Sequence, residues 1–307
     1  MLDFFDIILP IANVEINAAL VLIIGIITGI ITGLFGLGGG FIIIPFLTLY
    51  NLPIGVAVAA SVNQMIAGTL SAFMANYHMK KVDLKLGYLM IISGTCGVAL
   101  GAFSLIQLNK LEHGDTILTW LFLILLSFIA FITTVSSIRL LLKPAHHDDH
   151  HHTPKIFKAM PIKRHFDAFA GEISVIPIIF ISILGGVFVI LLGLGGGFII
   201  IPFLVYVLRC KKDFLGGSLQ MQILATSIMS TIFQALEAHT VDIVLSTLLI
   251  IGAVVGARIG VSISHALSNK TYQIILSVVL LTVACTMFYK KLSEPVDKFQ
   301  YTVINDV

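Results

Sequence analysis

The sequence predicts an all-α polytopic membrane protein made of two inverted-topology repeats, each with a glycine-broken short helix near its start. The 307 residues are 58% hydrophobic and only 11% charged, with a mean hydropathy of +1.05. The surface of a soluble domain of this size needs more charge. No Asp, Glu, Lys or Arg occurs from Ile16 to Met79, which is longer than a membrane-spanning helix requires. The string GLGGGFIIIPFL occurs at Gly36–Leu47 and again, unchanged, at Gly193–Leu204, which indicates a duplication.

Each half is predicted to contain five helical segments, which gives about eight full spans and two short half-helices. In the first half they are about Asn17–Phe35, Phe41–Tyr50, Ile54–Tyr77, Leu84–Leu108 and Asp115–Leu142. In the second half they are about Ile173–Leu192, Phe198–Leu208, Phe214–Leu236, Val241–His265 and Lys270–Tyr289. The second segment of each half covers only roughly 16 Å, about half of the hydrocarbon thickness. The glycines before it therefore belong inside the bilayer, where irregular backbone must line a protein cavity.

The chain divides into four parts: a first transmembrane repeat (1–142), a His-rich linker (143–170), a second transmembrane repeat (171–292) and a polar C-terminal tail (293–307). Lys and Arg are biased in opposite directions between equivalent loops of the two halves, so the repeats are expected to cross the membrane in opposite senses. The segment from Arg139 to His165 holds six Lys or Arg residues and is expected to be cytoplasmic. We expect a multi-pass protein of the cell membrane (the inner or plasma membrane) in the lipid bilayer.

The glycines of the repeated string are the leading candidates for a substrate site. They are Gly38, Gly39 and Gly40 in the first copy, and Gly195, Gly196 and Gly197 in the second. Each triplet immediately precedes a helix, where about four N–H groups lack partners and the helix dipole is positive. An anion fits such a position without any charged side chain. The alternative is that the glycines only allow close helix packing.

Polar side chains in the charge-free spans are the next candidates. Asn63 and Gln222 are equivalent in the two halves and are expected to form a pseudo-symmetric pair beside the glycines. Gln64, Thr226 and Ser227 are assigned to the same substrate site, although the two hydroxyls can also bond to their own helix. Ser61 and Arg258 are candidates for the mouth or gate, with snorkelling to the interface as the alternative for Arg258.

The two GLGGGFIIIP elements resemble the TauE/SafE family of membrane transporters, described as sulfite or sulfonate exporters, and the resemblance covers essentially the whole chain. Ala60–Met65 is similar to the A-T-N-K-L pattern of that family, with Ser61 for Thr and Gln64 for Lys, and Ala225-Thr226-Ser227 matches its A-T-S. The resemblance implies a passive or ion-coupled carrier of small, often sulfur-containing, anions. Gln64 lacks the positive charge of the family's Lys.

The sequence offers no catalytic constellation and no cofactor fingerprint, so an enzyme is not expected, and the basic residues in loops give no sign of nucleic-acid binding. Our expectation is alternating-access transport of sulfite, an organosulfonate or a related oxyanion or carboxylate. The substrate would lie between the two glycine breaks while one half rocks against the other. No cofactor and no resident metal are expected; the substrate, the direction, a coupling H⁺ or Na⁺ and the oligomeric state stay open.

Two alternatives remain. The tract His146–His152, with two aspartates, could serve a divalent metal transporter as a collector of ions, although a disordered linker has the same composition. The protein could also be a membrane scaffold that transports nothing. A metal carrier would need carboxylates, histidines or thiols within its spans, and the spans are nearly bare of them.

The loop charges give a testable orientation. We expect a cysteine placed at Thr153 to stay protected from a membrane-impermeant thiol reagent in intact cells, whereas one at Gln300 is modified. The reason is the preference of Lys and Arg for cytoplasmic loops. The reverse labelling pattern would overturn this orientation.

Overall fold

The computed structural model describes residues 6–8, 15–50, 52–111, 114–142, 161–169, 172–208, 210, 212–238 and 240–293. The first half contains β1 (Asp6–Ile8), β2 (Glu15–Asn17), α1 (Ala18–Phe35), α2 (Gly40–Leu49), α3 (Ile54–His78), α4 (Leu84–Asn109) and α5 (Gly114–Leu142). The second half contains β3 (Lys163–His165), β4 (Glu172–Ser174), α7 (Ile176–Leu192), α8 (Gly197–Pro202), α9 (Lys212–Phe233), α10 (Ile243–Ala266) and α11 (Asn269–Ser293). Two π-helical segments, Phe203–Val207 and Gln234–Ala238, continue α8 and α9. The predicted all-α architecture is confirmed.

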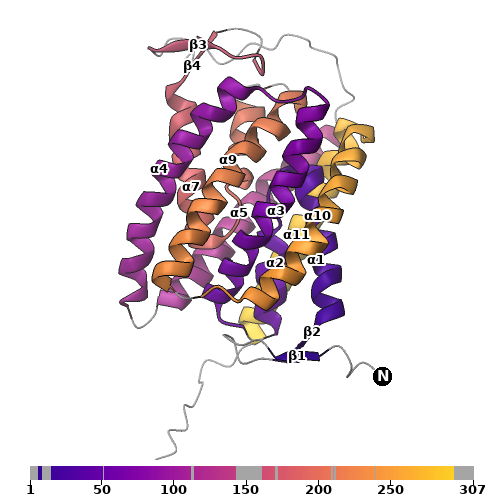
Figure 1. Cartoon of the computed structure of the whole chain (residues 1–307). Coiled ribbons are helices and arrows are strands. Elements are labelled where there is room, and N and C mark those ends of the chain that lie inside the picture. The colour runs from indigo at the N-terminus through magenta and orange to yellow at the C-terminus, as the bar shows by residue number, and fades with distance from the viewer. Residues whose placement is uncertain are drawn as a thin grey trace, which may run out of the picture.

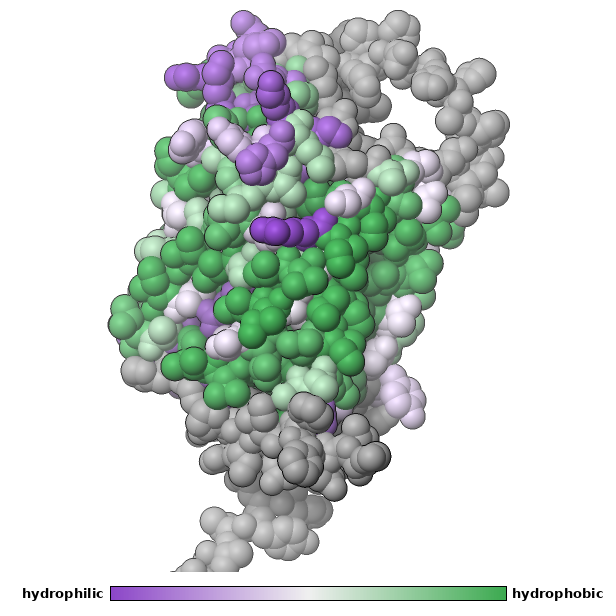
Figure 2. All heavy atoms as spheres, turned by 45° about the vertical axis from the view of Figure 1, so that its right-hand side comes forward, coloured by the Kyte–Doolittle hydropathy of each residue, from purple (hydrophilic) through white to green (hydrophobic). Residues whose placement is uncertain are grey.

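The helices have the length and composition of membrane spans. Among the described residues, six stretches qualify: Ala18–Phe35, Ile54–His78, Leu84–Asn109, Thr116–Ile138, Gly216–Glu237 and Ile243–Ser264. The other two predicted full spans correspond to the shorter apolar stretches Ile176–Leu192 and Ile274–Tyr289. Figure 2 shows hydrophobic residues over the middle of the bundle and hydrophilic ones gathered at the end where β3 and β4 lie. This surface is typical of a protein surrounded by lipid.

A short β-hairpin precedes the first helix of each half, and the sequence analysis did not predict either one. Asp6 pairs with Asn17 in the first hairpin, and the residues 157 positions later, Lys163 and Ser174, pair in the second. The strand β3 lies within the segment assigned to the linker, so the repeated unit begins before residue 171. Figure 1 shows β1 and β2 at one end of the bundle and β3 and β4 at the other.

A buried carboxylate joins the second hairpin to the bundle. Asp83, only 2% exposed, caps α4 by accepting a hydrogen bond from Leu86 N–H at 3.1 Å. Its other oxygen accepts one from Ala168 N–H at 3.0 Å, in the turn between β3 and β4. The backbone N–H of Asp83 donates to the hydroxyl of Ser218 on α9. Asp242 caps α10 in the equivalent way, so the two halves share this device.

Helices from different halves pack in parallel pairs through glycines. A Cβ built on Gly25 of α1 would approach the carbonyl oxygen of Leu249 to 2.8 Å, and one on Gly33 would overlap the carbonyl of Ala257. The equal eight-residue steps show that α1 and α10 run in the same direction. Small residues spaced by four allow this approach in lipid: they are Gly25, Gly29 and Gly33 on α1, and Gly252, Gly256 and Gly260 on α10.

The pair of α4 and α7 repeats this arrangement. A Cβ on Gly97 would overlap the carbonyl of Ile183, and one on Gly101 would lie 3.0 Å from the Cα of Val187. Each pair joins a helix of one half to a helix of the other. These close backbone contacts therefore cross between the repeats.

We expect Gly33→Ala to lower the stability of the purified protein by about 1–3 kcal/mol, the usual range for overpacking. The added methyl group has no space, because the backbone of Ala257 occupies it. Thermal unfolding in detergent measures the effect. The control is Gly216→Ala, since a Cβ there meets nothing within 4 Å. Equal melting temperatures for both variants would show that α1 and α10 pack less closely than described.

Candidate functional site

The chain turns back into the bundle at each glycine break. Gly36 ends α1 with φ +66°, and its N–H donates to Thr32 O at 2.8 Å. Three residues later the chain lies beside Thr28, because a Cβ on Gly39 would be 2.8 Å from the Cβ of that residue. Thr28 lies seven residues before the end of α1, which corresponds to roughly 10 Å along the helix. The helix α2 therefore begins at depth within the bundle, as predicted for the glycines.

The second break follows the same path. Gly193 ends α7 with φ +61°, and a Cβ on Gly196 would lie 2.8 Å from the carbonyl oxygen of Gly185, seven residues before the end of that helix. The helix α8 is short, and the π-helical segment Phe203–Val207 continues it.

The two breaks touch each other backbone to backbone. A Cβ on Gly40 would overlap the carbonyl of Gly193, and one on Gly197 would lie 2.8 Å from the carbonyl oxygen of Gly36. The equivalent rings of Phe41 and Phe198 meet edge to face, with centroids 4.6 Å apart. The structure thus brings Gly38–Gly40 and Gly195–Gly197 together. The loops themselves fill the space between the breaks, so the expected position of a substrate directly between them stays a prediction that would require the breaks to separate.

Gln64 lies beside the first break. Its side chain is fully buried, and neither amide atom has a hydrogen-bond partner within the described part of the chain. A Cβ on Gly39 would lie 3.0 Å from Oε1 and 3.3 Å from Nε2, so the amide faces this glycine. Gly39 is the N-cap of α2 and, as a glycine, has no side chain to cap the helix. The first donors that bond back to Gly39 O are Ile42 and Ile43, as at the start of a helix.

The second break has a related but different polar neighbour. Gln222 lies against Gly185 and donates from Nε2 to Ser182 O at 3.1 Å. Its Oε1 and the hydroxyl of Ser182 are buried without partners within the described residues. This side therefore offers an unpaired amide oxygen and an unpaired hydroxyl, whereas the whole amide of Gln64 is unpaired.

Asn63 and Gln222 do not form the predicted pair. Asn63 donates to Ser246 Oγ at 3.0 Å and accepts from Thr231 Oγ1 at 2.7 Å. Thr231 lies nine residues along α9 from Gln222, which is roughly 13 Å. The helices α3 and α9 cross in opposite directions, and equivalent residues away from the crossing point diverge. Asn63 thus joins three helices instead of facing a shared site.

The remaining predicted residues have separate positions. Ser61 donates to Val58 O and to Gly193 O, so it contacts the second break directly. Thr226 bonds to the carbonyls of Gln222 and Ile223 on its own helix, and Ser227 lies 4.0 Å from the sulfur of Met65. Arg258 is exposed on the outer face of α10, away from the glycine loops.

Thr28 and Ser182, which were not among the predicted site residues, flank the two glutamine amides. Both are buried polar residues in otherwise apolar helices, and that signal had identified Asn63. A hydroxyl side chain alone does not distinguish these two residues from the many serines and threonines that bond to their own helix.

Potential metal ligands are sparse in the described residues: no three His, Cys, Asp or Glu side chains gather closely enough to hold an ion there. The tract His146–His152 lies outside the described residues.

Comparison with known proteins agrees with this architecture. A family model described as sulfite exporter TauE/SafE matches residues 21–287. The chain is 23% identical over 281 residues to the probable membrane transporter protein YunE of Bacillus subtilis, covering 88% of this chain and 97% of that protein. A probable membrane transporter of Methanocaldococcus jannaschii is 39% identical over 77 residues, or 22% of this chain and 29% of that protein. No solved structure matches the chain.

The contrast between two neighbouring amides gives a stability prediction. Asn63→Leu should lower the free energy of unfolding by about 1–3 kcal/mol, because Thr231 and Ser246 lose their buried partner. Gln64→Met should leave it unchanged or higher, since it removes two unpaired buried polar atoms. Thermal or denaturant unfolding of the purified variants measures both. A loss of stability in Gln64→Met as large as that of Asn63→Leu would show that the Gln64 amide is satisfied.

Proposed function

Since the chain belongs to the TauE/SafE sulfite exporter family, we propose that it transports a small anion: sulfite, an organosulfonate, or a related oxyanion or carboxylate. The protein is a multi-pass membrane transporter by family. The chemistry of the site supports the narrower choice of an anion, as the contacts at Gln64 indicate.

The unpaired amide of Gln64 is the observation that carries this proposal. A buried amide without hydrogen bonds costs free energy, and a protein keeps such a group where a ligand can satisfy it. The amide faces Gly39, the N-cap of α2, where the helix dipole is positive and the first N–H groups lack partners within the helix. An anion placed there accepts hydrogen bonds from both. The glycines Gly38–Gly40 let it approach the backbone, and no cationic side chain is needed.

The second break supports a related role in the transport cycle. Gly195–Gly197 and Gln222, with Thr226 and Ser227 on the same helix, would contact the anion when that side opens. Ser61 contacts this break already, through Gly193.

Alternating access then requires the two breaks to separate in turn. The hairpins at opposite ends and the two parallel helix pairs support inverted repeats. The close glycine contacts of α1 with α10, and of α4 with α7, favour these mixed pairs as the moving bodies. The expected rocking of one sequence half against the other is revised accordingly.

Flux and binding test the proposal. Purified protein in liposomes should carry one or more members of a panel of sulfite, sulfonates and carboxylates, and the same anion should raise its melting temperature. Gln64→Met should weaken binding by about 1.5–3 kcal/mol, or roughly 10- to 100-fold, the contribution of a hydrogen bond to a charged group.

The control for that substitution is Gln107→Leu, an exposed amide on α4 outside the site, which should bind as the wild type does. Gly39→Ala should also weaken binding: its φ of −81° suits alanine, but its methyl group would press on Thr28 and Gln64, so its thermal unfolding must be measured alongside. Gly196→Val is not a clean test, since φ is +66° and the backbone of Gly185 leaves no space. Wild-type affinity in Gln64→Met would place the site elsewhere.

A further inference from the structure

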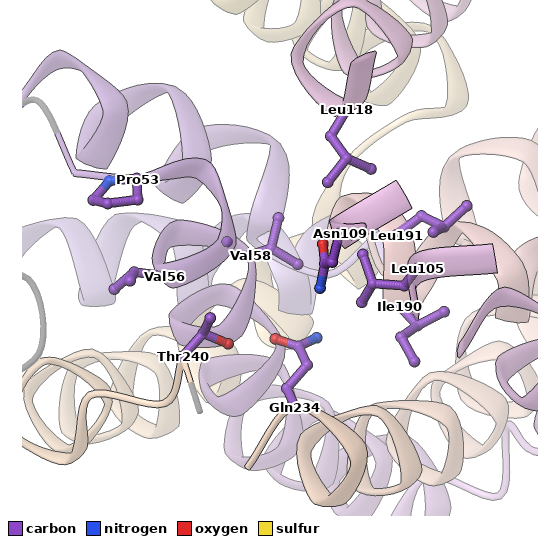
Figure 3. Close-up of a pocket in the computed structure, with 11 residues that line it drawn as sticks. Pro53, Val56, Val58, Leu105, Asn109, Leu118, Ile190, Leu191, Gln234 and Thr240 are labelled. Carbon is purple, nitrogen blue, oxygen red and sulfur yellow. The ribbon is translucent and has the colours of Figure 1, made fainter. Parts of the chain in front are cut away.

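A cavity of about 150 Å³ (Figure 3) lies near the end of the bundle at which α3 and α5 begin. Its walls come from the start of α3, the end of α4, the start of α5, the end of α7 and the residues that follow α9. A cavity of this size can hold a molecule about as large as benzene. It is therefore large enough for a small oxyanion or a short organic acid.

Three polar side chains line this otherwise apolar cavity. They are Asn109, Gln234 and Thr240, and none of the described lining residues is charged. Figure 3 shows the amide of Gln234 directed into the space between Thr240 and Asn109. Asn109 is exposed, so the cavity communicates with the surface at this point.

The Gln234 amide is buried and only half satisfied. The side chain is 2% exposed; its Nε2 donates to Ser230 Oγ at 3.0 Å, and its Oε1 has no partner within the described residues. The serine hydroxyl can also donate, so a rotated amide would accept from Ser230 and direct its NH₂ into the cavity. In that arrangement Gln234 offers donors to an anion.

The cavity lies next to the second glycine break, with Val58 between them. Val58 forms part of its wall, and a Cβ on Gly193 would lie 3.3 Å from the Cα of Val58. Leu191, on the opposite wall, is two residues before Gly193. The hydrogen bond from Ser61 Oγ to Gly193 O, at 3.1 Å, closes the structure between the cavity and the glycines.

We propose that this cavity is a second solute site, a vestibule in which the transported anion binds to Gln234, Asn109 and Thr240 before or after it passes the glycine breaks. The proposal rests on the proposed function. It assigns a path at one end of the bundle, with the contact between Ser61 and Gly193 as its inner closure.

Filling the cavity tests its role in flux. Gly55 lines it in the first turn of α3, and a Cβ there meets only the methyl group of Thr240, at 3.4 Å. Gly55→Leu should therefore fold normally, with thermal unfolding close to the wild type, and reduce anion flux in liposomes at least tenfold. Gln234→Leu should reduce flux as well. Gln107→Leu, at the same end of α4 as Asn109, should not reduce it. Wild-type flux in a folded Gly55→Leu protein would contradict the proposal that the cavity is a vestibule.

Labelling tests access independently of transport. In a protein whose three cysteines are replaced, Val58→Cys should react with an anionic methanethiosulfonate reagent, and adding Gly55→Leu should slow this reaction at least tenfold. Val62→Cys, one turn deeper on α3 and fully buried, should stay unmodified. An unreactive Val58→Cys, or a rate that Gly55→Leu leaves unchanged, would contradict the proposal. If the wild type carries no anion of the panel, the proposed function fails, and labelling alone decides whether the cavity admits a solute.

Discussion

The two glycine breaks pack backbone against backbone, because Gly40 faces the carbonyl of Gly193 and Gly197 faces that of Gly36. Any side chain at these positions would separate the breaks and remove the edge-to-face contact of Phe41 with Phe198. The short helices then could not begin deep inside the bundle. Their depth is what gives the first N–H groups of α2 a buried neighbour in Gln64 instead of lipid or water. The polar chemistry of the candidate site thus follows from a contact made without side chains.

The pairing of helices across the halves limits how this contact can open. In lipid no hydrophobic force holds helices together, so close packing of small residues contributes much of the association. The glycines of α1 and α10 approach each other's backbones, as do those of α4 and α7. Separating the two sequence halves would break both interfaces. In the proposed alternating access, moving one mixed pair past the other would keep both interfaces. The helices α3 and α9, which cross between the pairs, would then carry Gln64 and Gln222 with their respective sides.

The sequence was sufficient to predict the helices and the glycine breaks between them, because charge-free length and repeated glycines are direct signals of long apolar helices and of their interruption. It did not predict the hairpins, whose strands are three residues long. Their one signal was the similarity of Glu15-Ile16-Asn17 to Glu172-Ile173-Ser174, at the spacing of the repeat. The pairing of Asn63 with Gln222 failed for a geometric reason: pseudo-symmetry places equivalent residues together only at the axis. The antiparallel crossing of α3 and α9 puts that axis near Met65 and Ser227, not at Asn63.

The two breaks have identical sequences but different conformations. Gly39 has φ −81° and begins a ten-residue helix, whereas Gly196 has φ +66° and begins a six-residue helix that continues as a π-helix. Since the twelve residues are the same, their surroundings must cause the difference. Gln64 and Thr28 flank the first break, and Gly185 and Gln222 flank the second. One twelve-residue sequence thus holds two conformations in two settings, and the proposed transport cycle would require a break to pass between such conformations.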